Sequence, residues 1–132
     1  MKKLIITLCC LGFLNAGIYT NIDTAFEKAE KNNKLLVLFA VTDTCRHCHT
    51  FLNNLKNTQT LDILGKEYEV AILEIKDNLE LFANYFTLSV TPTTFVINPK
   101  RPDLFIPEIK GAVEPNKVLE YVDKVREVLN PK

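Results

Sequence analysis

The sequence has no net charge and no long apolar segment, and both absences narrow the classes of protein it can belong to. Its 16 lysine and arginine residues balance 16 aspartate and glutamate residues, so no net field attracts nucleic acid or an anionic membrane. We therefore expect no nucleic-acid partner. The apolar run near the start has about eleven residues, whereas a membrane-spanning helix needs roughly twenty. With 132 residues and no internal repeat or linker, the chain has room for one folded domain.

The first seventeen residues have the pattern of a secretory signal peptide. Met1 to Lys3 is a short basic segment, Leu4 to Leu14 is the apolar run, and Asn15 to Gly17 supplies small residues where cleavage would fall. We predict a signal peptide over residues 1–17 and a folded domain over residues 18–132. The protein is then exported, with the periplasm as the expected compartment. The alternatives are an uncleaved leader that retains the protein at the membrane and a buried N-terminal strand.

Cysteine is scarce, and only Cys45 and Cys48 lie outside the first ten residues. Cys9 and Cys10 lie inside the apolar run and are expected to act as small hydrophobic residues. A disulfide between Cys45 and Cys48 would close a loop of only a few residues and would constrain the unfolded chain very little. We therefore expect this pair to serve a chemical role, because it is poorly placed to stabilise the fold.

Both histidines of the chain, His47 and His49, lie beside the cysteine pair. Two thiols at this spacing can form a redox-active disulfide, bind a metal or attach a haem. Attachment of a c-type haem would use His49 as the axial ligand, but only His47 and Met1 remain, so the usual sixth ligand is missing. Zinc would use Cys45, Cys48 and one histidine, yet a structural zinc site normally takes its second ligand pair from elsewhere in the chain.

Apolar patterning after the leader alternates between helices and buried strands. Strand, helix and strand in that order imply a right-handed crossover and a parallel pair, and the short link between the last two strands implies an antiparallel hairpin. Pro107 confines the final strand to an edge. This pattern predicts an α/β fold with a central mixed sheet of about four strands flanked by helices. The expected elements are a helix capped at Asp23 and Thr24, a strand at 34–41, helices at 46–57 and 61–65, a strand at 68–75, a helix at 79–86, strands at 93–98 and 104–110, and a helix from Pro115 onward.

The cysteine pair falls where the first strand ends and the next helix begins. A thiolate at a helix N-terminus is stabilised by unpaired backbone N–H groups and by the helix dipole. Cys45 is therefore the predicted nucleophile, and Cys48, one turn further on, is the predicted resolving thiol. Arg46 and His47 add positive or switchable charge between the two sulfurs and are predicted to favour the thiolate. Exchange would pass through a mixed disulfide at Cys45.

This order of elements around Cys-x-x-Cys resembles the thioredoxin superfamily, specifically its small exported thioredoxin-like proteins. The segment from Tyr85 to Val96 is similar to the one that leads into the cis-proline strand of that family, and Lys110 to Pro115 is similar to its glycine turn before the last helix. Bond statistics alone would favour a trans Pro92, whereas the resemblance implies a cis bond. It also implies that Thr91 lies against the disulfide and offers backbone hydrogen bonds to an extended substrate.

The resemblance implies a thiol-disulfide oxidoreductase that exchanges disulfides with cysteine-containing exported proteins. The Cys45–Cys48 disulfide would be its only redox group, so no separate cofactor is expected. We further expect a membrane-bound or soluble redox partner and, because the chain is small, a monomer. The alternative within the same fold is a non-catalytic binding module or chaperone that holds partners through the groove at Thr91 and Pro92.

The sequence also departs from the best-known reductases of this superfamily. Those proteins have a tryptophan before the first cysteine, and this chain has none and carries Thr44 there. They also bury an acid on the strand before the motif, where this chain has Leu38 or Phe39 depending on a one-residue gap. Asp43 is close in sequence, but it falls in the exposed turn and is expected to be a solvated or capping residue.

The two residues between the cysteines are a second departure. The reductases carry Gly-Pro there, whereas this chain carries Arg46-His47. A histidine immediately before the second cysteine resembles the strongly oxidising exported members, in which it stabilises the reduced thiolate form. The sequence therefore favours a relatively oxidising pair.

Overall fold

The computed structural model describes residues 17–129, in which a single mixed sheet separates two groups of helices. The predicted signal peptide lies outside the described residues except for Gly17. The sheet has five strands in the order β1-β3-β2-β4-β5, one more than the sequence predicts. Strand β2 is central and pairs in parallel with β3 and antiparallel with β4. The strands are β1 (Ile18–Tyr19), β2 (Leu36–Val41), β3 (Glu69–Glu74), β4 (Thr93–Ile97) and β5 (Ile109–Lys110).

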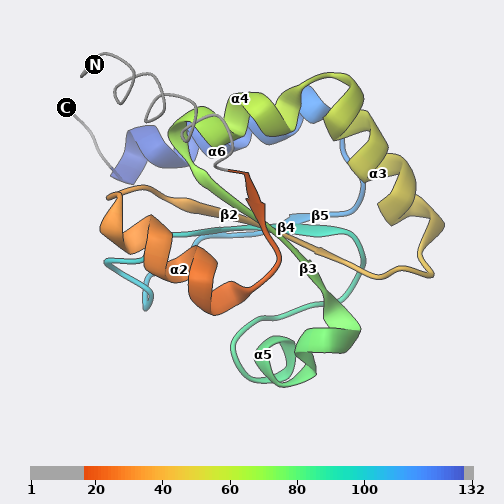
Figure 1. Cartoon of the computed structure of the whole chain (residues 1–132), viewed down its shortest axis with the longest axis horizontal. Coiled ribbons are helices and arrows are strands. Elements are labelled where there is room, and N and C mark those ends of the chain that lie inside the picture. The colour runs from red at the N-terminus through yellow and green to blue at the C-terminus, as the bar shows by residue number, and fades with distance from the viewer. Residues whose placement is uncertain (1–16, 130–132) are drawn as a thin grey trace, which may run out of the picture.

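Helices cover both faces of the sheet, with α3, α4 and α6 above it and α2 and α5 below it (Figure 1). A short 3-10 turn joins β3 to α5. No helix within residues 17–129 is long and apolar enough to cross a membrane. The helices are α2 (Ile22–Lys31), α3 (Arg46–Asn57), α4 (Thr60–Glu67), α5 (Leu79–Asn84) and α6 (Pro115–Leu129), and the 3-10 turn η1 is Ile75–Asn78.

Strand β2 explains why the two helical layers hold together. All six of its residues are buried, as expected for a strand covered on both faces. Successive side chains of a strand point to opposite faces, so Val37 and Phe39 join the core under α3, α4 and α6, whereas Leu36 and Leu38 join the core against α2 and α5. The continuous apolar run in the sequence therefore builds two separate cores.

Helix α2 begins two residues earlier than the sequence predicts. Its N-cap is Asn21, whose side-chain oxygen accepts a hydrogen bond from the backbone N–H of Thr24 at 3.0 Å. Asparagine is among the strongest N-cap residues. Thr24, which the sequence predicts as part of the cap, lies inside the helix instead, and its backbone N–H is the group that Asn21 satisfies. The predicted capping box at Thr24 is therefore wrong.

The last strand is shorter than predicted. Only Ile109 and Lys110 pair with β4, opposite Thr94 and Thr93, and the predicted stretch from Leu104 to Glu108 is loop. Pro107 has no N–H to donate to a neighbouring strand, and its carbonyl accepts a hydrogen bond from the Tyr121 hydroxyl of α6. The loop therefore packs toward the helix instead of continuing the sheet, although β5 is an edge strand as predicted.

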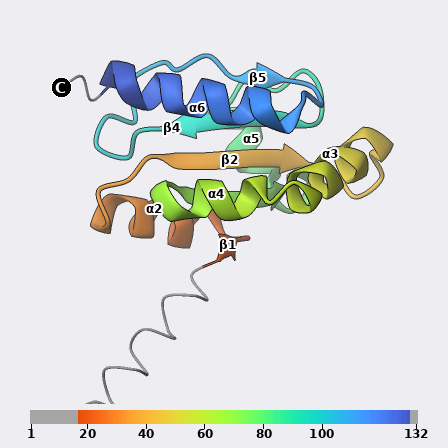
Figure 2. The same cartoon turned by 90° about the horizontal axis from the view of Figure 1, so that it is seen from above.

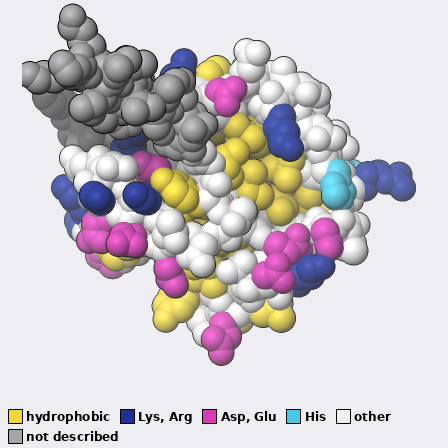
Figure 3. Space-filling view, viewed as in Figure 1, with side chains coloured by type: hydrophobic (Ala, Val, Ile, Leu, Met, Phe, Trp, Pro, Cys, Tyr) yellow, Lys and Arg dark blue, Asp and Glu magenta, His cyan; other side chains and the backbone are white. Residues whose placement is uncertain are grey.

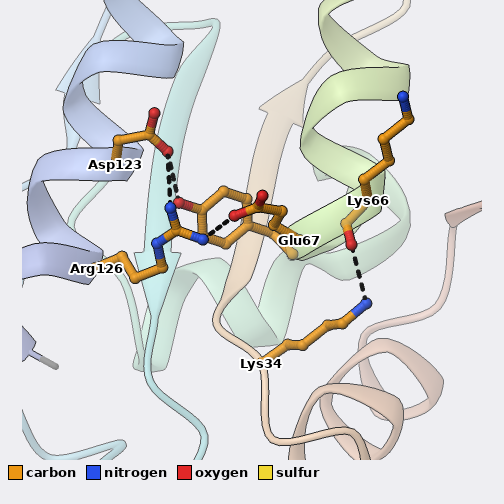
Figure 4. A network of polar contacts seen from close by, with 6 residues as sticks. Lys34, Lys66, Glu67, Asp123 and Arg126 are labelled. Carbon is orange, nitrogen blue, oxygen red and sulfur yellow. Dashed lines mark hydrogen bonds and ion pairs between the residues drawn. The ribbon is translucent and has the colours of Figure 1, made fainter.

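A network of polar side chains joins α4 to α6 at the end of the sheet where β2 and β3 begin (Figure 4). The Tyr68 hydroxyl donates to Asp123 at 2.7 Å, and the Arg126 guanidinium lies 5.3 Å from the centre of the Tyr68 ring. Arg126 also pairs with Glu67. Burial, together with the neighbouring Asp123 carboxylate, raises the pKa of Tyr68. This network holds the helices together far from the cysteine pair, which follows the opposite end of β2.

Candidate active site

A tight turn delivers the first cysteine from the end of β2 to the start of α3. The backbone N–H of Cys45 donates to the carbonyl of Thr42 at 3.2 Å and closes the turn. Helix α3 then begins at Arg46, and Figure 2 shows it leaving the end of β2. The sequence prediction of a cysteine pair at a strand-to-helix junction is confirmed.

Cys45 is itself the N-cap of α3. Its backbone is extended, with φ of −92° and ψ of 114°, and its Sγ accepts a hydrogen bond from the backbone N–H of Cys48 at 3.1 Å. The first N–H groups of a helix have no partner within the helix. The sulfur therefore occupies the place that a serine or aspartate oxygen takes in other helices, where a negative charge is most stable.

The segment before β4 lies directly against this sulfur. The Thr91 hydroxyl donates to Cys45 Sγ at 3.4 Å, and the Cys45 thiol faces the Thr91 carbonyl oxygen at 3.8 Å. The bond between Thr91 and Pro92 is cis, as the resemblance implies. The Pro92 carbonyl accepts a hydrogen bond from the backbone N–H of Gly111 at 2.8 Å, and Gly111 has a φ of +89° that only glycine adopts readily.

The two cysteines differ sharply in exposure. Cys45 is partly exposed, whereas Cys48 is only 1% exposed, and both are free thiols. Cys48 lies on the inner face of α3, the same face as Phe51, whose ring meets Phe39 of β2 edge to face at 5.8 Å. The Cys45 sulfur is therefore accessible from outside the protein, whereas the Cys48 sulfur is not.

The pKa values of the two thiols move in opposite directions. Burial raises the pKa of Cys45, but hydrogen bonds from the Cys48 thiol, the Thr91 hydroxyl and the Cys48 and His47 backbone N–H groups outweigh it, so its pKa lies below the ordinary value. Burial is also the largest influence on Cys48, and donation of its proton to Cys45 acts in the same direction, so its pKa is raised. The arrangement therefore concentrates the negative charge on the accessible sulfur.

We expect alkylation of the reduced protein to distinguish the two thiols by pH. Because only the thiolate reacts, the rate for Cys45 should rise with pH through its lowered pKa and level off below pH 8.5, near the pKa of an ordinary cysteine. Cys48 should react slowly at every pH below that value. Iodoacetamide rates between pH 4 and pH 10, followed by peptide mass spectrometry, would measure this. Two cysteines that titrate together above pH 8.5 would contradict the assigned hydrogen bonds.

Arg46 and His47 are both exposed on the first turn of α3. Of these two residues, His47 contributes its backbone N–H to the lowered pKa of Cys45. The predicted tuning by the two side chains stays a prediction. His49 is also exposed, and its Nε2 lies 2.7 Å from the backbone carbonyl oxygen of Asp43. The sequence did not indicate that contact.

Asp43 is exposed in the turn, as predicted, but it also makes hydrogen bonds to Lys76 and Glu74. Its carboxylate accepts a hydrogen bond from Lys76 Nζ at 2.5 Å, which lowers the pKa of Asp43 and raises that of Lys76. Its backbone N–H donates to Glu74 at 3.2 Å. Glu74 and Lys76 follow more than 30 residues later in the chain, so no local pattern in the sequence could have indicated these contacts.

The strand before the motif places an apolar ring where the better-known reductases bury an acid. Phe39 points toward the α3 side of the sheet and packs on Phe51, whereas Leu38 faces α2. Thr94 of β4 lies opposite Phe39 of β2 in the sheet. It is fully buried, and its hydroxyl has no hydrogen-bond partner among the described residues. Within residues 17–129, no three His, Cys, Asp or Glu side chains are grouped so as to hold a metal ion.

A reduced cysteine pair at a helix start, facing a cis-proline segment at the head of the adjacent strand, defines an α/β protein built around a dithiol. The family model described as a thioredoxin-like domain matches residues 22–126, so the chain belongs to the thioredoxin-like family. The thioredoxins of this family are thiol-disulfide oxidoreductases. A comparison with curated proteins gives no match.

Solved thioredoxin structures share the same fold. A thioredoxin from Thermus thermophilus superposes with a TM-score of 0.71 at 17% identity, over 83% of this chain and 87% of the other. A poplar thioredoxin h gives 0.66 at 13% identity over 88% and 99%, and the Fasciola hepatica thioredoxin gives 0.63 at 18% identity over 82% and 97%. At these identities the likeness concerns the fold alone, and the predicted thioredoxin-like architecture is confirmed.

Proposed function

We propose that the protein is a thiol-disulfide oxidoreductase that works through Cys45 and Cys48. The observation that carries this proposal is the placement of the Cys45 sulfur, which accepts hydrogen bonds from Cys48 N–H at 3.1 Å and from the Thr91 hydroxyl at 3.4 Å. Both contacts favour the thiolate, which is the nucleophile in disulfide exchange. The buried thiol of Cys48, one helical turn away, would resolve the mixed disulfide in the second step of the exchange.

The reaction balances within the dithiol and its substrate. The Cys45 thiolate attacks one sulfur of a substrate disulfide, forms a mixed disulfide, and releases the other substrate sulfur as a thiolate that takes a proton from water. Cys48 then attacks Cys45 Sγ and its proton passes to the departing substrate sulfur, which leaves as the second substrate thiol, so that Cys45–Cys48 is oxidised. The substrate gains two electrons and the protein loses two. The same steps in reverse oxidise a substrate dithiol.

Substrate contact would be made beside Thr91. The Thr91 carbonyl faces the Cys45 sulfur, and the neighbouring Val90 is 43% exposed, so an extended chain lying there would bring its own cysteine to Cys45. Thr91 and Pro92 are therefore the proposed substrate-binding residues. We propose cysteine-containing proteins as substrates and a separate membrane-bound or soluble protein as the redox partner.

The proposed compartment is the periplasm. Its support is the leader pattern of residues 1–17, which lies outside the described residues apart from Gly17. The substrates would then be exported proteins, and the protein would act as a monomer. A leader that stays attached would keep the same domain at the membrane surface.

Equilibration with glutathione tests the proposed function and its direction. We expect one reversible two-electron transition, with a potential less negative than the about −270 mV of thioredoxin, because a histidine immediately before the second cysteine favours the reduced thiolate form. His47→Gln should move the potential toward more negative values, whereas Lys56→Gln at the other end of α3 should leave it unchanged. Alkylation followed by mass spectrometry would measure the oxidised fraction.

Two results would contradict this assignment. A protein whose two thiols do not exchange with glutathione as a pair is not a dithiol oxidoreductase. A potential close to that of thioredoxin would leave the oxidoreductase in place and overturn the oxidising direction drawn from His47.

A further inference from the structure

Asp43 is held at each of its polar groups, although it lies in an exposed turn. Its backbone N–H donates to Glu74 at 3.2 Å, its carboxylate accepts from Lys76 at 2.5 Å, and its carbonyl oxygen lies 2.7 Å from Nε2 of His49. These three partners come from β3, from η1 and from α3. The turn that carries Cys45 is therefore fixed from three directions.

From these contacts we propose that His49 is a positioning residue for the Cys45 thiolate, an inference that rests on the proposed function. His49 lies one helical turn after Cys45, and its backbone N–H donates to the Cys45 carbonyl at 3.2 Å. Its ring also contacts the carbonyl of Asp43. His49 therefore contacts the backbone both at Cys45 and at Asp43, two residues earlier. The ring closes a loop that contains both cysteines.

The hydrogen bond to Asp43 fixes the donor atom. A backbone carbonyl can only accept, so Nε2 of His49 carries a proton. Nε2 carries it both in the neutral ring with the proton on that nitrogen and in the imidazolium ion. The contact therefore does not depend on charge, unlike the exposed ion pair between Lys76 and Asp43, which salt screens.

The position of the turn controls how well the Cys45 sulfur is hydrogen-bonded. The sulfur meets donors on two elements, Cys48 N–H on α3 and the Thr91 hydroxyl before β4. Without the His49 ring, Asp43 keeps its contacts to Glu74 and Lys76 but loses its side-chain link to α3. The turn can then move relative to α3, and the sulfur loses its alignment with one or both donors. Each lost donor weakens the thiolate relative to the thiol.

Charge on the His49 ring is the competing explanation for any effect of this residue. The charged or titratable groups around the turn include Asp43, Glu74, Lys76 and Asp77, and Arg46 and His47 follow it on α3. Figure 3 shows histidine at the surface where α3 begins, beside a group of acidic and basic side chains. A histidine that acts by its charge would need the imidazolium form, whereas one that acts by its hydrogen bond needs only the Nε2 proton.

Two substitutions separate these explanations. His49→Leu removes the donor, and we expect it to raise the Cys45 pKa by about 0.5 to 1 unit, which slows alkylation at pH 6 by about three- to tenfold. His49→Gln keeps an N–H donor without the charge and should stay within about twofold of the natural protein. Thr50→Leu, an exposed neighbour on α3, is the matched control and should change nothing. Iodoacetamide rates against pH, with peptide mapping of Cys45, give all three values.

The alkylation rates of Cys45 separate failure of the proposed function from failure of the positioning role. A natural protein whose Cys45 titrates like an ordinary cysteine contradicts the proposed function itself. If the natural Cys45 pKa is low and His49→Leu leaves it low, the function stands and the positioning role is overturned. Equal losses in His49→Leu and His49→Gln, confined to pH values at which the ring is charged, would also overturn it in favour of charge. Because His49 is exposed, circular dichroism should show all variants folded.

Discussion

Replacing Cys48 by alanine should turn the protein into a trap that accumulates mixed disulfides through Cys45. The substitution removes the proposed resolving thiol and leaves the proposed nucleophile accessible, since Cys45 is partly exposed and Cys48 is 1% exposed. Turnover in a disulfide-exchange assay should fall by about a hundredfold or more, because resolution within the motif is lost and only slow attack by external thiols remains. Non-reducing electrophoresis after acid quenching would show the adducts.

The controls of this experiment also decide between an enzyme and a binding module. Cys45→Ala should form no adduct, because the remaining Cys48 is buried on the inner face of α3. The double variant gives the background. A binding module that uses the groove at Thr91 and Pro92 would hold its partners without covalent bonds. Partner capture that is equal in the natural protein and in all three variants would therefore contradict the oxidoreductase.

The redox potential of the dithiol depends on the residues around it more than on its two sulfurs. Burial works against both thiolates, and the hydrogen bonds to Cys45 reverse its effect only at that sulfur. Behind the pair lies Phe39 instead of a carboxylate, beside the Thr94 hydroxyl, which has no hydrogen-bond partner within residues 17–129. No acid on β2 can then take the proton of Cys48. The proton of Cys48 therefore cannot leave by the route available in reductases that bury such an acid.

The sequence predicted the parts of the fold that long apolar runs specify. Strands β2 and β3 lie within two residues of their predicted bounds, because a continuous apolar run of that length can be buried in few other ways. The strand predicted at 104–110 is longer than the observed one, because residues 104–108 form a loop in which the Pro107 carbonyl accepts a hydrogen bond from Tyr121, and only Ile109 and Lys110 pair with β4. Strand β1 was missed because two residues, Ile18 and Tyr19, are too short to show a pattern.

The residues and contacts of the site also differ in how far the sequence could predict them. Cys45 and Cys48 stood out through their spacing, and Thr91 and Pro92 through a family resemblance, since nothing in their local sequence indicates a cis bond. The contacts that fix the turn could not be predicted, because Asp43 meets Lys76 from 33 residues away. Contacts of that kind depend on where β3 ends relative to β2, which only the folded sheet determines.

Phe51→Ala should destabilise the protein by about 3 to 5 kcal/mol, the usual cost of removing a buried phenylalanine side chain. The Phe51 side chain is 1% exposed and its ring packs edge to face on Phe39 at 5.8 Å, so the substitution leaves a cavity between α3 and β2. Urea denaturation of the reduced protein would measure the loss without a contribution from the Cys45–Cys48 disulfide.

Ile63→Ala on α4 is the matched control, because Ile63 is 47% exposed and its truncation should cost less than about 1 kcal/mol. The Phe51 variant should also broaden the pH titration of Cys45, since Phe51 anchors the helix whose first N–H groups hold that sulfur. A Phe51 variant as stable as the Ile63 variant would mean that α3 is not held on β2 by this contact. The placement of Cys45 against Thr91 would then need another support.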